Sequence, residues 1–203
     1  MKMLYGLILC LFMLSQPVMA DKKSNAEQLI KSKLDMVIKI LQNTEIEKSE
    51  KRKKINDIVS PMFNFKKMAQ LSLGKKHWLS LTNEEKKRFT DLFVIRLKAS
   101  YLDKLGLYSD ESIIYNPAVE IKNKVHVPTE LVTKENRISM LYKLYESKHC
   151  WRVYDIEIQG VSVVRSYRSQ FNQILSKGTI NDLFASLEQQ QSSKSTASDK
   201  NEL

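Results

Sequence analysis

The chain has 203 residues, of which 42% are hydrophobic and 28% charged, and an excess of basic residues gives it a formal net charge of +10. This length and apolar content are enough for one domain with a substantial core, and the small numbers of glycine (5) and proline (4) favour regular elements over long loops. The lysines are dispersed without interleaved aromatic residues, which argues against the stacking surface of a nucleic-acid-binding protein.

Residues 1–20 have the pattern of an export signal: a basic start, an apolar run over 4–14 and small residues at the end. We predict that this segment is a cleaved signal peptide and that the mature protein is periplasmic. A single domain is expected over 21–189. A disordered tail is expected over 190–203, because that segment is rich in serine, glutamine and lysine. Cys150 is the one cysteine after the signal, so we expect no intramolecular disulfide and a buried free thiol.

The first half of the chain is predicted to be helical. Apolar residues recur at helical spacing, and start and stop signals divide this part into helices over 24–43, 47–60, 64–73 and 82–105. Asn64 is expected to cap the third of these helices, and Gly74 to follow its end. Thr82 and Glu85 have the spacing of a capping box, which marks the start of the fourth.

From about residue 112 the pattern changes to alternation of apolar and polar residues. Four runs rich in β-branched and aromatic residues predict antiparallel strands, with hairpin turns near 136–137 and 147–149. Helices are then expected over 164–177 and 180–188. Helices, a β-meander and further helices in this order predict an α+β fold in one domain.

The sequence contains no nucleophile elbow, P-loop, dinucleotide-binding glycine pattern or zinc-binding HExxH pattern. His77, His126 and His149 are scattered, and none has a carboxylate at a ligand-like spacing, so neither a metal site nor a cofactor is expected. Large apolar residues gather in three blocks, over 62–81, 89–101 and 151–171. Composition alone leaves open whether these blocks fill a core or line a cavity.

Two stretches resemble the sequence motifs of one protein family. The first stretch contains Phe-Asn-Phe-Lys-Lys-Met-Ala at 63–69, Leu-Gly at 73–74, Trp78, and the capping box followed by Phe89. The second contains Trp-Arg-Val-Tyr-Asp-Ile at 151–156, Gly-Val-Ser-Val-Val at 160–164 and Tyr-Arg-Ser-Gln-Phe at 167–171. In order and spacing they are similar to the motifs of the MlaC family, also called the toluene-tolerance family, over most of residues 24–188.

The resemblance implies helices packed around a twisted antiparallel sheet, somewhat like the nuclear-transport-factor-2 class. It implies a deep apolar cavity between helices and sheet for the acyl chains of a glycerophospholipid, which would be cargo and not a cofactor. It also implies partners: an inner-membrane MCE-domain protein of an ABC transporter and an outer-membrane lipoprotein–porin complex. We expect the carrier itself to be a monomer.

Candidate residues for the wall of this cavity come from both halves of the predicted fold. They are Met68, Leu71, Trp78, Phe93, Leu97, Tyr101, Met140, Tyr142, Trp151, Val153, Val161, Val163 and Phe171. Arg152, Tyr167 and Arg168 are candidates for contact with a head-group phosphate, because arginine matches phosphate geometry. The alternative for Arg168 is a structural ion pair with Asp155.

The resemblance therefore implies a phospholipid-binding shuttle, and not an enzyme, that moves phospholipids between the outer and inner membranes and maintains outer-membrane lipid asymmetry. A periplasmic chaperone or a lipoprotein carrier is the alternative, because either would also need an apolar groove. An enzyme on a similar fold would require a polar dyad inside the pocket, and the sequence offers no obvious one.

Overall fold

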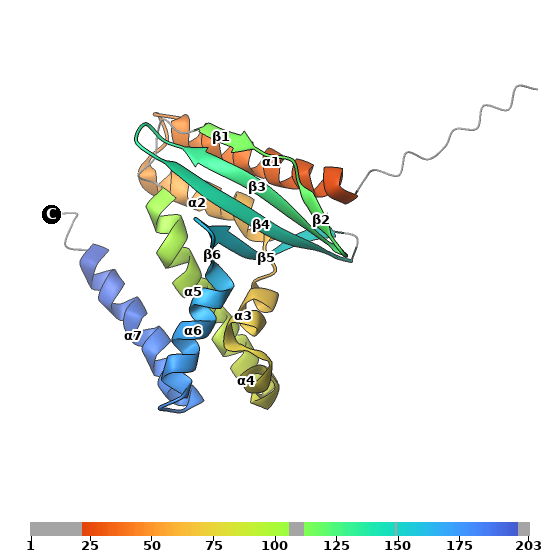
Figure 1. Ribbon diagram of the computed structural model, residues 1–203. Coiled ribbons are helices and arrows are strands. Elements are labelled where there is room, and N and C mark those ends of the chain that lie inside the picture. Colours follow the sequence, from red (N-terminus) through yellow and green to blue (C-terminus); the bar gives the residue numbers. More distant parts are fainter. Residues whose placement is uncertain (1–21, 106–111, 149, 199–203) are drawn as a thin grey trace, which may run out of the picture.

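The computed structural model describes residues 22–105, 112–148 and 150–198 (Figure 1). The predicted signal peptide and His149 therefore lie outside the described residues. The helices before the sheet are α1 (Lys22–Gln42), α2 (Lys48–Val59), the short 3₁₀ helix η1 (Ser60–Met62), α3 (Phe65–Leu73), α4 (Lys75–Ser80) and α5 (Asn83–Leu105). The strands are β1 (Ser112–Tyr115), β2 (Val119–Ile121), β3 (Lys124–Val132), β4 (Arg137–Ser147), β5 (Cys150–Ile158) and β6 (Val161–Ser162). The chain ends in α6 (Val163–Leu175) and α7 (Ile180–Ser198), so the α+β prediction is confirmed.

The predicted helix boundaries are set by the expected capping residues. The Asn64 side chain accepts a hydrogen bond of 2.9 Å from the backbone N–H of Lys67, which satisfies a free donor at the start of α3. Gly74 ends α3 with a φ of +86°, a conformation that glycine adopts without a Cβ clash. The backbone N–H of Glu85 donates to Thr82 Oγ1, and that of Thr82 donates to Glu85 Oε2, so the capping box is also confirmed.

The strands form one antiparallel sheet in the order β1-β3-β4-β5-β6, and β2 pairs with the other end of β3. A β-bulge interrupts the pairing of β4 and β5, because Lys143 lies opposite Asp155 whereas Leu144 lies opposite Val153. One extra residue on β5, Tyr154, therefore changes which face of the sheet the following side chains occupy. As a result Val153 and Ile156 face the same side of the sheet. In a regular strand two residues three positions apart would face opposite sides.

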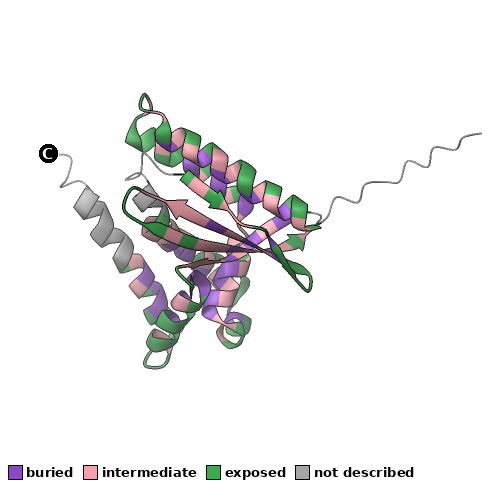
Figure 2. Cartoon of the chain, turned by 45° about the horizontal axis from the view of Figure 1, so that its top comes forward, coloured by how far each residue is buried: buried purple, intermediate pink, exposed green. Residues whose placement is uncertain are grey.

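The apolar side chains form two separate cores. One core lies between α1, α2 and one face of the sheet, and Ile30, Val125 and Leu144 are fully buried in it. The other lies among α3 to α7, and Phe89, Phe93 and Leu183 are fully buried there. Figure 1 shows α1 and α2 beside the sheet and the remaining helices gathered below it, and the buried faces in Figure 2 point inward in both groups. No helix among the described residues is both long and apolar enough to span a bilayer.

Two expectations about local structure are corrected. Helix α7 continues to Ser198, beyond residue 188 where the last helix was predicted to end. The segment after Thr179 contains neither glycine nor proline, so no strong helix breaker follows the cap. Cys150 is in a strand as expected, but it is exposed and not buried. It is the first residue of β5, next to the turn, where neither core covers it.

Candidate functional site

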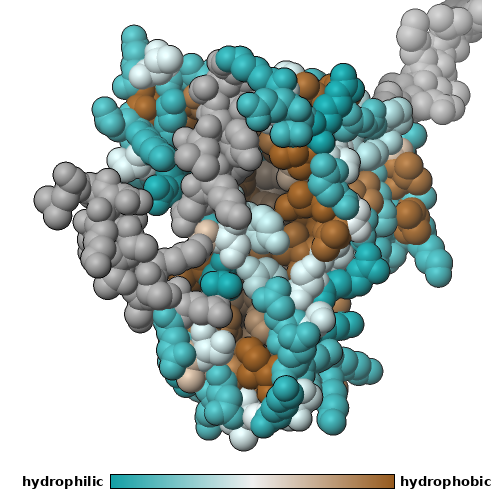
Figure 3. Space-filling model, turned by 60° about the vertical axis from the view of Figure 1, so that its left-hand side comes forward, coloured by the Kyte–Doolittle hydropathy of each residue, from teal (hydrophilic) through white to brown (hydrophobic). Residues whose placement is uncertain are grey.

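A cavity of about 380 Å³ lies between the two cores. This volume is within the range of about 300–1,000 Å³ that small-molecule pockets occupy. The helices, with Phe63 from the link between η1 and α3, contribute Leu34, Val37, Ile38, Leu41, Val59, Met62, Phe63, Phe65, Met68, Leu97, Lys98, Ser100, Tyr101 and Val163 to its wall. The strands contribute Ile113, Thr129, Leu131, Ile138, Met140, Tyr142, Ile156 and Ile158. On the side of the molecule shown in Figure 3, hydrophobic surface borders a recess within otherwise hydrophilic surroundings.

Two of the few polar side chains in the cavity wall are hydrogen-bonded within the protein. The Tyr142 hydroxyl contacts Met140 Sδ at 3.8 Å, and burial raises the pKa of this tyrosine. Ser100 Oγ accepts a hydrogen bond of 3.2 Å from the buried Tyr167. An apolar cavity of this kind offers water few partners, so it favours an apolar ligand. Such a wall suits hydrocarbon chains, and the described residues that form it include no histidine and no carboxylate.

The cavity reaches the surface beside α5. Tyr101 is 38% exposed although it lines the cavity, and Lys98 is one helical turn before it on the same face. The ammonium group of Lys98 lies 5.5 Å from the centroid of the Phe65 ring, which itself stacks on Phe63 at 5.5 Å. A cation is thereby placed where the apolar wall meets solvent.

Six of the thirteen predicted wall residues line the cavity: Met68, Leu97, Tyr101, Met140, Tyr142 and Val163. The structure places the other seven elsewhere. Trp78, Phe93 and Phe171 are buried in the helical core, and Trp151 and Val153 in the core of α1, α2 and the sheet. Leu71 borders a hollow on the opposite face of the sheet, and Val161 is 60% exposed. Aromatic size was a poor guide, because the rings pack against one another: Phe93 lies 5.3 Å from Tyr167 and 6.2 Å from Phe89, centroid to centroid.

The three predicted head-group residues do not line the cavity. Arg152 lies opposite Tyr145 in the register of the sheet. Its neighbours Trp151 and Val153 both face the core of α1, α2 and the sheet, so the side chain of Arg152 faces away from the cavity. Tyr167 is buried in the helical core. The predicted ion pair between Arg168 and Asp155 is not formed, because Arg168 Nε instead donates to the backbone oxygen of Leu71 at 2.9 Å.

Sequence reasoning missed the contribution of α1 to the cavity. Leu34, Val37, Ile38 and Leu41 line the cavity from the predicted helix over 24–43, and none of them was assigned to the site from the sequence. The apolar face of this helix is wider than one row of inward-facing residues, because both Val37 and Ile38 are apolar. This width was the feature of the sequence that could have indicated a contribution to the cavity. Nothing in the sequence distinguishes Lys98 from the other lysines of α5.

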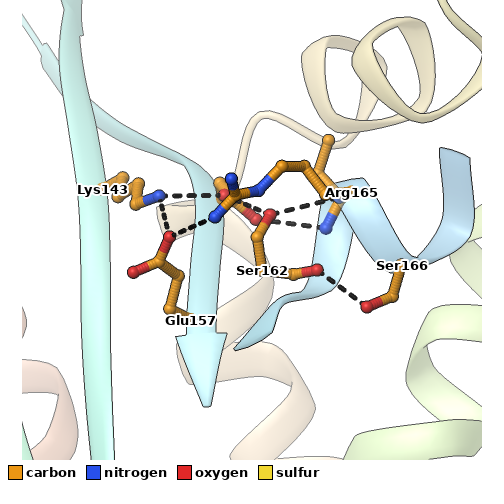
Figure 4. A network of polar contacts seen from close by, with 7 residues as sticks. Lys143, Glu157, Ser162, Arg165 and Ser166 are labelled. Atoms are coloured by element: carbon orange, nitrogen blue, oxygen red, sulfur yellow. Dashed lines mark hydrogen bonds and ion pairs between the residues drawn. The ribbon is translucent and has the colours of Figure 1, made fainter. Parts of the chain in front are cut away.

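A second, polar hollow of about 340 Å³ lies on the opposite face of the sheet. Its wall consists of Leu71, His126, Lys143, Tyr154, Asp155, Ser162, Val164, Arg165 and Arg168. Asp155 accepts hydrogen bonds from Ser162 Oγ at 2.7 Å and from the backbone N–H of Val164 at 3.1 Å, and so fixes the start of α6. Glu157 binds both Lys143 and Arg165 in the same network (Figure 4).

The network shifts two pKa values downward. The hydrogen bond from Lys143 holds the pKa of Glu157 below its ordinary value. Burial, followed by the positive charge of Lys143, lowers the pKa of His126. Both shifts favour a neutral histidine and an ionised Glu157 at neutral pH. Among the described residues, no group of three or more His, Cys, Asp or Glu side chains is placed to hold a metal ion.

The substitution Glu157→Gln is expected to reduce stability in a pH-dependent way. A carboxyl whose pKa is lower in the folded than in the unfolded state stabilises the fold above its unfolded pKa, and this contribution disappears as pH falls through the folded pKa. Glu157 is 17% exposed, so we expect a loss of about 1–2 kcal/mol at pH 7 in urea unfolding. The loss should become small near pH 3. The exposed Glu146→Gln is the control, and equal losses at both pH values would contradict the assignment.

Comparison with known proteins identifies the family. The family model described as MlaC protein matches residues 31–189. The chain belongs to the MlaC family. The match spans α1 to α7 and thus includes the elements that form the cavity. No curated protein sequence matches this MlaC-family chain at a significant level.

The fold of this MlaC-family protein also occurs among solved structures. The phospholipid-binding protein from Ralstonia solanacearum, determined in complex with a phospholipid, is similar to it with a TM-score of 0.74. The two share 23% sequence identity, over 81% of this chain and 96% of the other. At this identity the likeness shows a shared fold.

Proposed function

We propose that this protein binds a glycerophospholipid, with acyl chains inside the cavity and the head group at the surface beside Tyr101 and Lys98. The observation that carries the proposal is the cavity itself, whose wall is almost entirely hydrocarbon. Membership of the MlaC family and the phospholipid in the Ralstonia structure support it.

Such a carrier must surround the acyl chains with a surface as apolar as the interior of a bilayer. Each methylene exposed to water costs about 0.8 kcal/mol, so one sixteen-carbon chain costs about 12 kcal/mol to bring into water. The apolar wall can offset this cost because it offers the chain hydrocarbon contacts and few polar groups. Transfer then needs no covalent chemistry, and the protein acts as a binding protein without enzymatic activity.

In this proposal the protein is exported after cleavage of residues 1–20 and works in the periplasm as a monomer with one lipid-binding domain. It carries phospholipid between an outer-membrane lipoprotein–porin complex and the MCE-domain protein of an inner-membrane ABC transporter, and so maintains outer-membrane lipid asymmetry. Directional transport requires energy, which the ATPase of the transporter would supply. The net positive charge would speed encounter with anionic surfaces more than it strengthens binding.

Native mass spectrometry of the purified protein tests lipid binding directly. We expect a complex with about one phospholipid per protein, and release of intact glycerophospholipid on activation. Lipid extraction and fragmentation would identify the head group and chain lengths. A protein that carries no lipid, and takes none up from phospholipid vesicles, would refute the proposal. Recovery of unfolded or lipidated protein clients in place of lipid would favour a chaperone or lipoprotein carrier.

Lys98 is proposed to contact the lipid phosphate, because its ammonium group lies at the edge of the apolar wall. Lys98→Met keeps the side-chain length and removes the charge. We expect it to lower affinity for lipids with a phosphate head group by about fivefold, in line with one partly exposed charge pair of about 1 kcal/mol. Affinity for a fatty alcohol of equal chain length should be unchanged. An equal effect on both ligands would assign Lys98 to the apolar wall alone.

A further inference from the structure

The polar hollow behind β5 has more hydrogen-bond donors than acceptors. The carboxylate that borders it, Asp155, already binds Ser162, Lys143 and the start of α6. The adjacent carboxylate of Glu157 is bound to Lys143 and Arg165. Arg168 Nε is bonded to the backbone of α3, but its terminal guanidinium nitrogens have no hydrogen-bond partner among the described residues. The unused hydrogen-bonding capacity of the hollow is therefore mainly cationic.

The two arginines are held in position for an anion. Arg168 packs over Gly74, where an added Cβ would lie 3.7 Å from its Nε, and the bond to the carbonyl of Leu71 fixes its direction. Arg165 lies one helical turn before it, with Glu157 anchoring one end of its guanidinium group at 3.0 Å. Like charges three residues apart on a helix repel each other, so an anion between them would be stabilising. Arginine forks bind carboxylates with two parallel hydrogen bonds.

We propose that this hollow is a docking point for an acidic protein partner, one of whose carboxylates binds between Arg165 and Arg168. A protein surface fits better than a free ion because the Arg165 side chain is 72% exposed, so a small anion would remain largely hydrated there.

The hollow and the cavity lie back to back. Ile156 and Ile158 face the cavity, whereas Asp155 borders the hollow and Glu157 binds the two basic residues Lys143 and Arg165 of its wall. At the start of α6, Val163 lines the cavity and the next residue lines the hollow. A partner bound at the arginines would therefore sit against the strand and helix that form one wall of the cavity. The docking proposal does not depend on what the cavity binds.

The test uses ¹⁵N-labelled protein titrated with a hexaglutamate peptide, with a Ser-Gly peptide of equal length as the neutral control. We expect the largest amide shifts at residues that border the hollow, including Leu71, Val164 and Arg165. The double variant Arg165→Gln, Arg168→Gln should weaken binding about tenfold. The matched control is Lys39→Gln with Lys53→Gln, which removes equal charge from exposed sites on α1 and α2 and should change binding less than about twofold.

Other outcomes would overturn the proposal. Equal weakening in both double variants would mean that the peptide senses net charge alone. Inorganic phosphate that shifts the same amides as tightly as the peptide would make the hollow a free-anion site. Because Arg168 also contacts α3, Arg165→Gln alone provides a variant with little risk to folding, and circular dichroism checks each protein. This single variant should weaken peptide binding about threefold, and unchanged binding would also refute docking.

Discussion

The substitution Leu131→Trp is expected to reduce the affinity for phospholipid by more than about tenfold. Leu131 lines the cavity from β3, is only partly buried and belongs to neither core, so a larger ring would occupy ligand space before it strained the fold. Displacing two methylenes from the cavity costs about 1.6 kcal/mol, which corresponds to slightly more than a factor of ten in affinity. The measurement is the fraction of lipid that the protein retains after equilibration with excess vesicles.

The neighbouring residue provides the control. Val132 is also partly buried, but alternation along β3 turns its side chain to the other face of the sheet, and it does not line the cavity. Val132→Trp should leave lipid retention within about twofold of the original protein, a change of less than about 0.5 kcal/mol. Equal losses in both variants would show that retention follows general stability, and the cavity would then not be the lipid site.

The substitution Phe93→Ala is expected to destabilise the lipid-free protein by about 3–5 kcal/mol. Phe93 is completely buried and contacts Phe89, Tyr167 and Phe171 in the helical core. Removing its ring leaves a void that these rigid neighbours cannot easily fill. Urea unfolding of delipidated protein, followed by circular dichroism, measures the loss.

A residue of the cavity wall should behave differently. Leu131→Ala enlarges a space that already exists, so we expect a loss of about 1 kcal/mol or less in the same unfolding experiment. In the presence of lipid the destabilisation by Leu131→Ala should increase, because bound ligand stabilises the folded state and this substitution removes ligand contacts. Comparable losses for Phe93 and Leu131 in the lipid-free protein would mean that the two residues share one packed core.

The sequence predicted most of the elements because their signals are local. The cap at Asn64, the capping box at Thr82 and the glycine at 74 each act within one helical turn. Cys150 was misjudged for a non-local reason: its burial depends on what packs over the end of β5. The continuation of α7 to Ser198 was missed because polar composition was given more weight than the lack of a helix breaker.

The site was predicted less well than the fold. The change of face at the bulge is visible in the sequence, where apolar positions shift from 151 and 153 to 156 and 158. That shift separates Ile156, which lines the cavity, from Asp155, which borders the hollow. The pattern does not reveal which of the inward-facing residues touch a void and which touch other side chains.

The sequence alone determined that this protein has an α+β fold with an amphipathic first helix and a β-meander. Its short motifs also determined that it belongs to the MlaC family. Periodicity specifies which side of each element is apolar, since burial needs only a hydrophobic face. The tertiary structure alone decided that Phe93 fills a core while Leu131 borders a cavity, and that Arg168 lies behind the sheet. The reason is that the cavity lies between two cores, and its position depends on the relative placement of distant elements that no local pattern records.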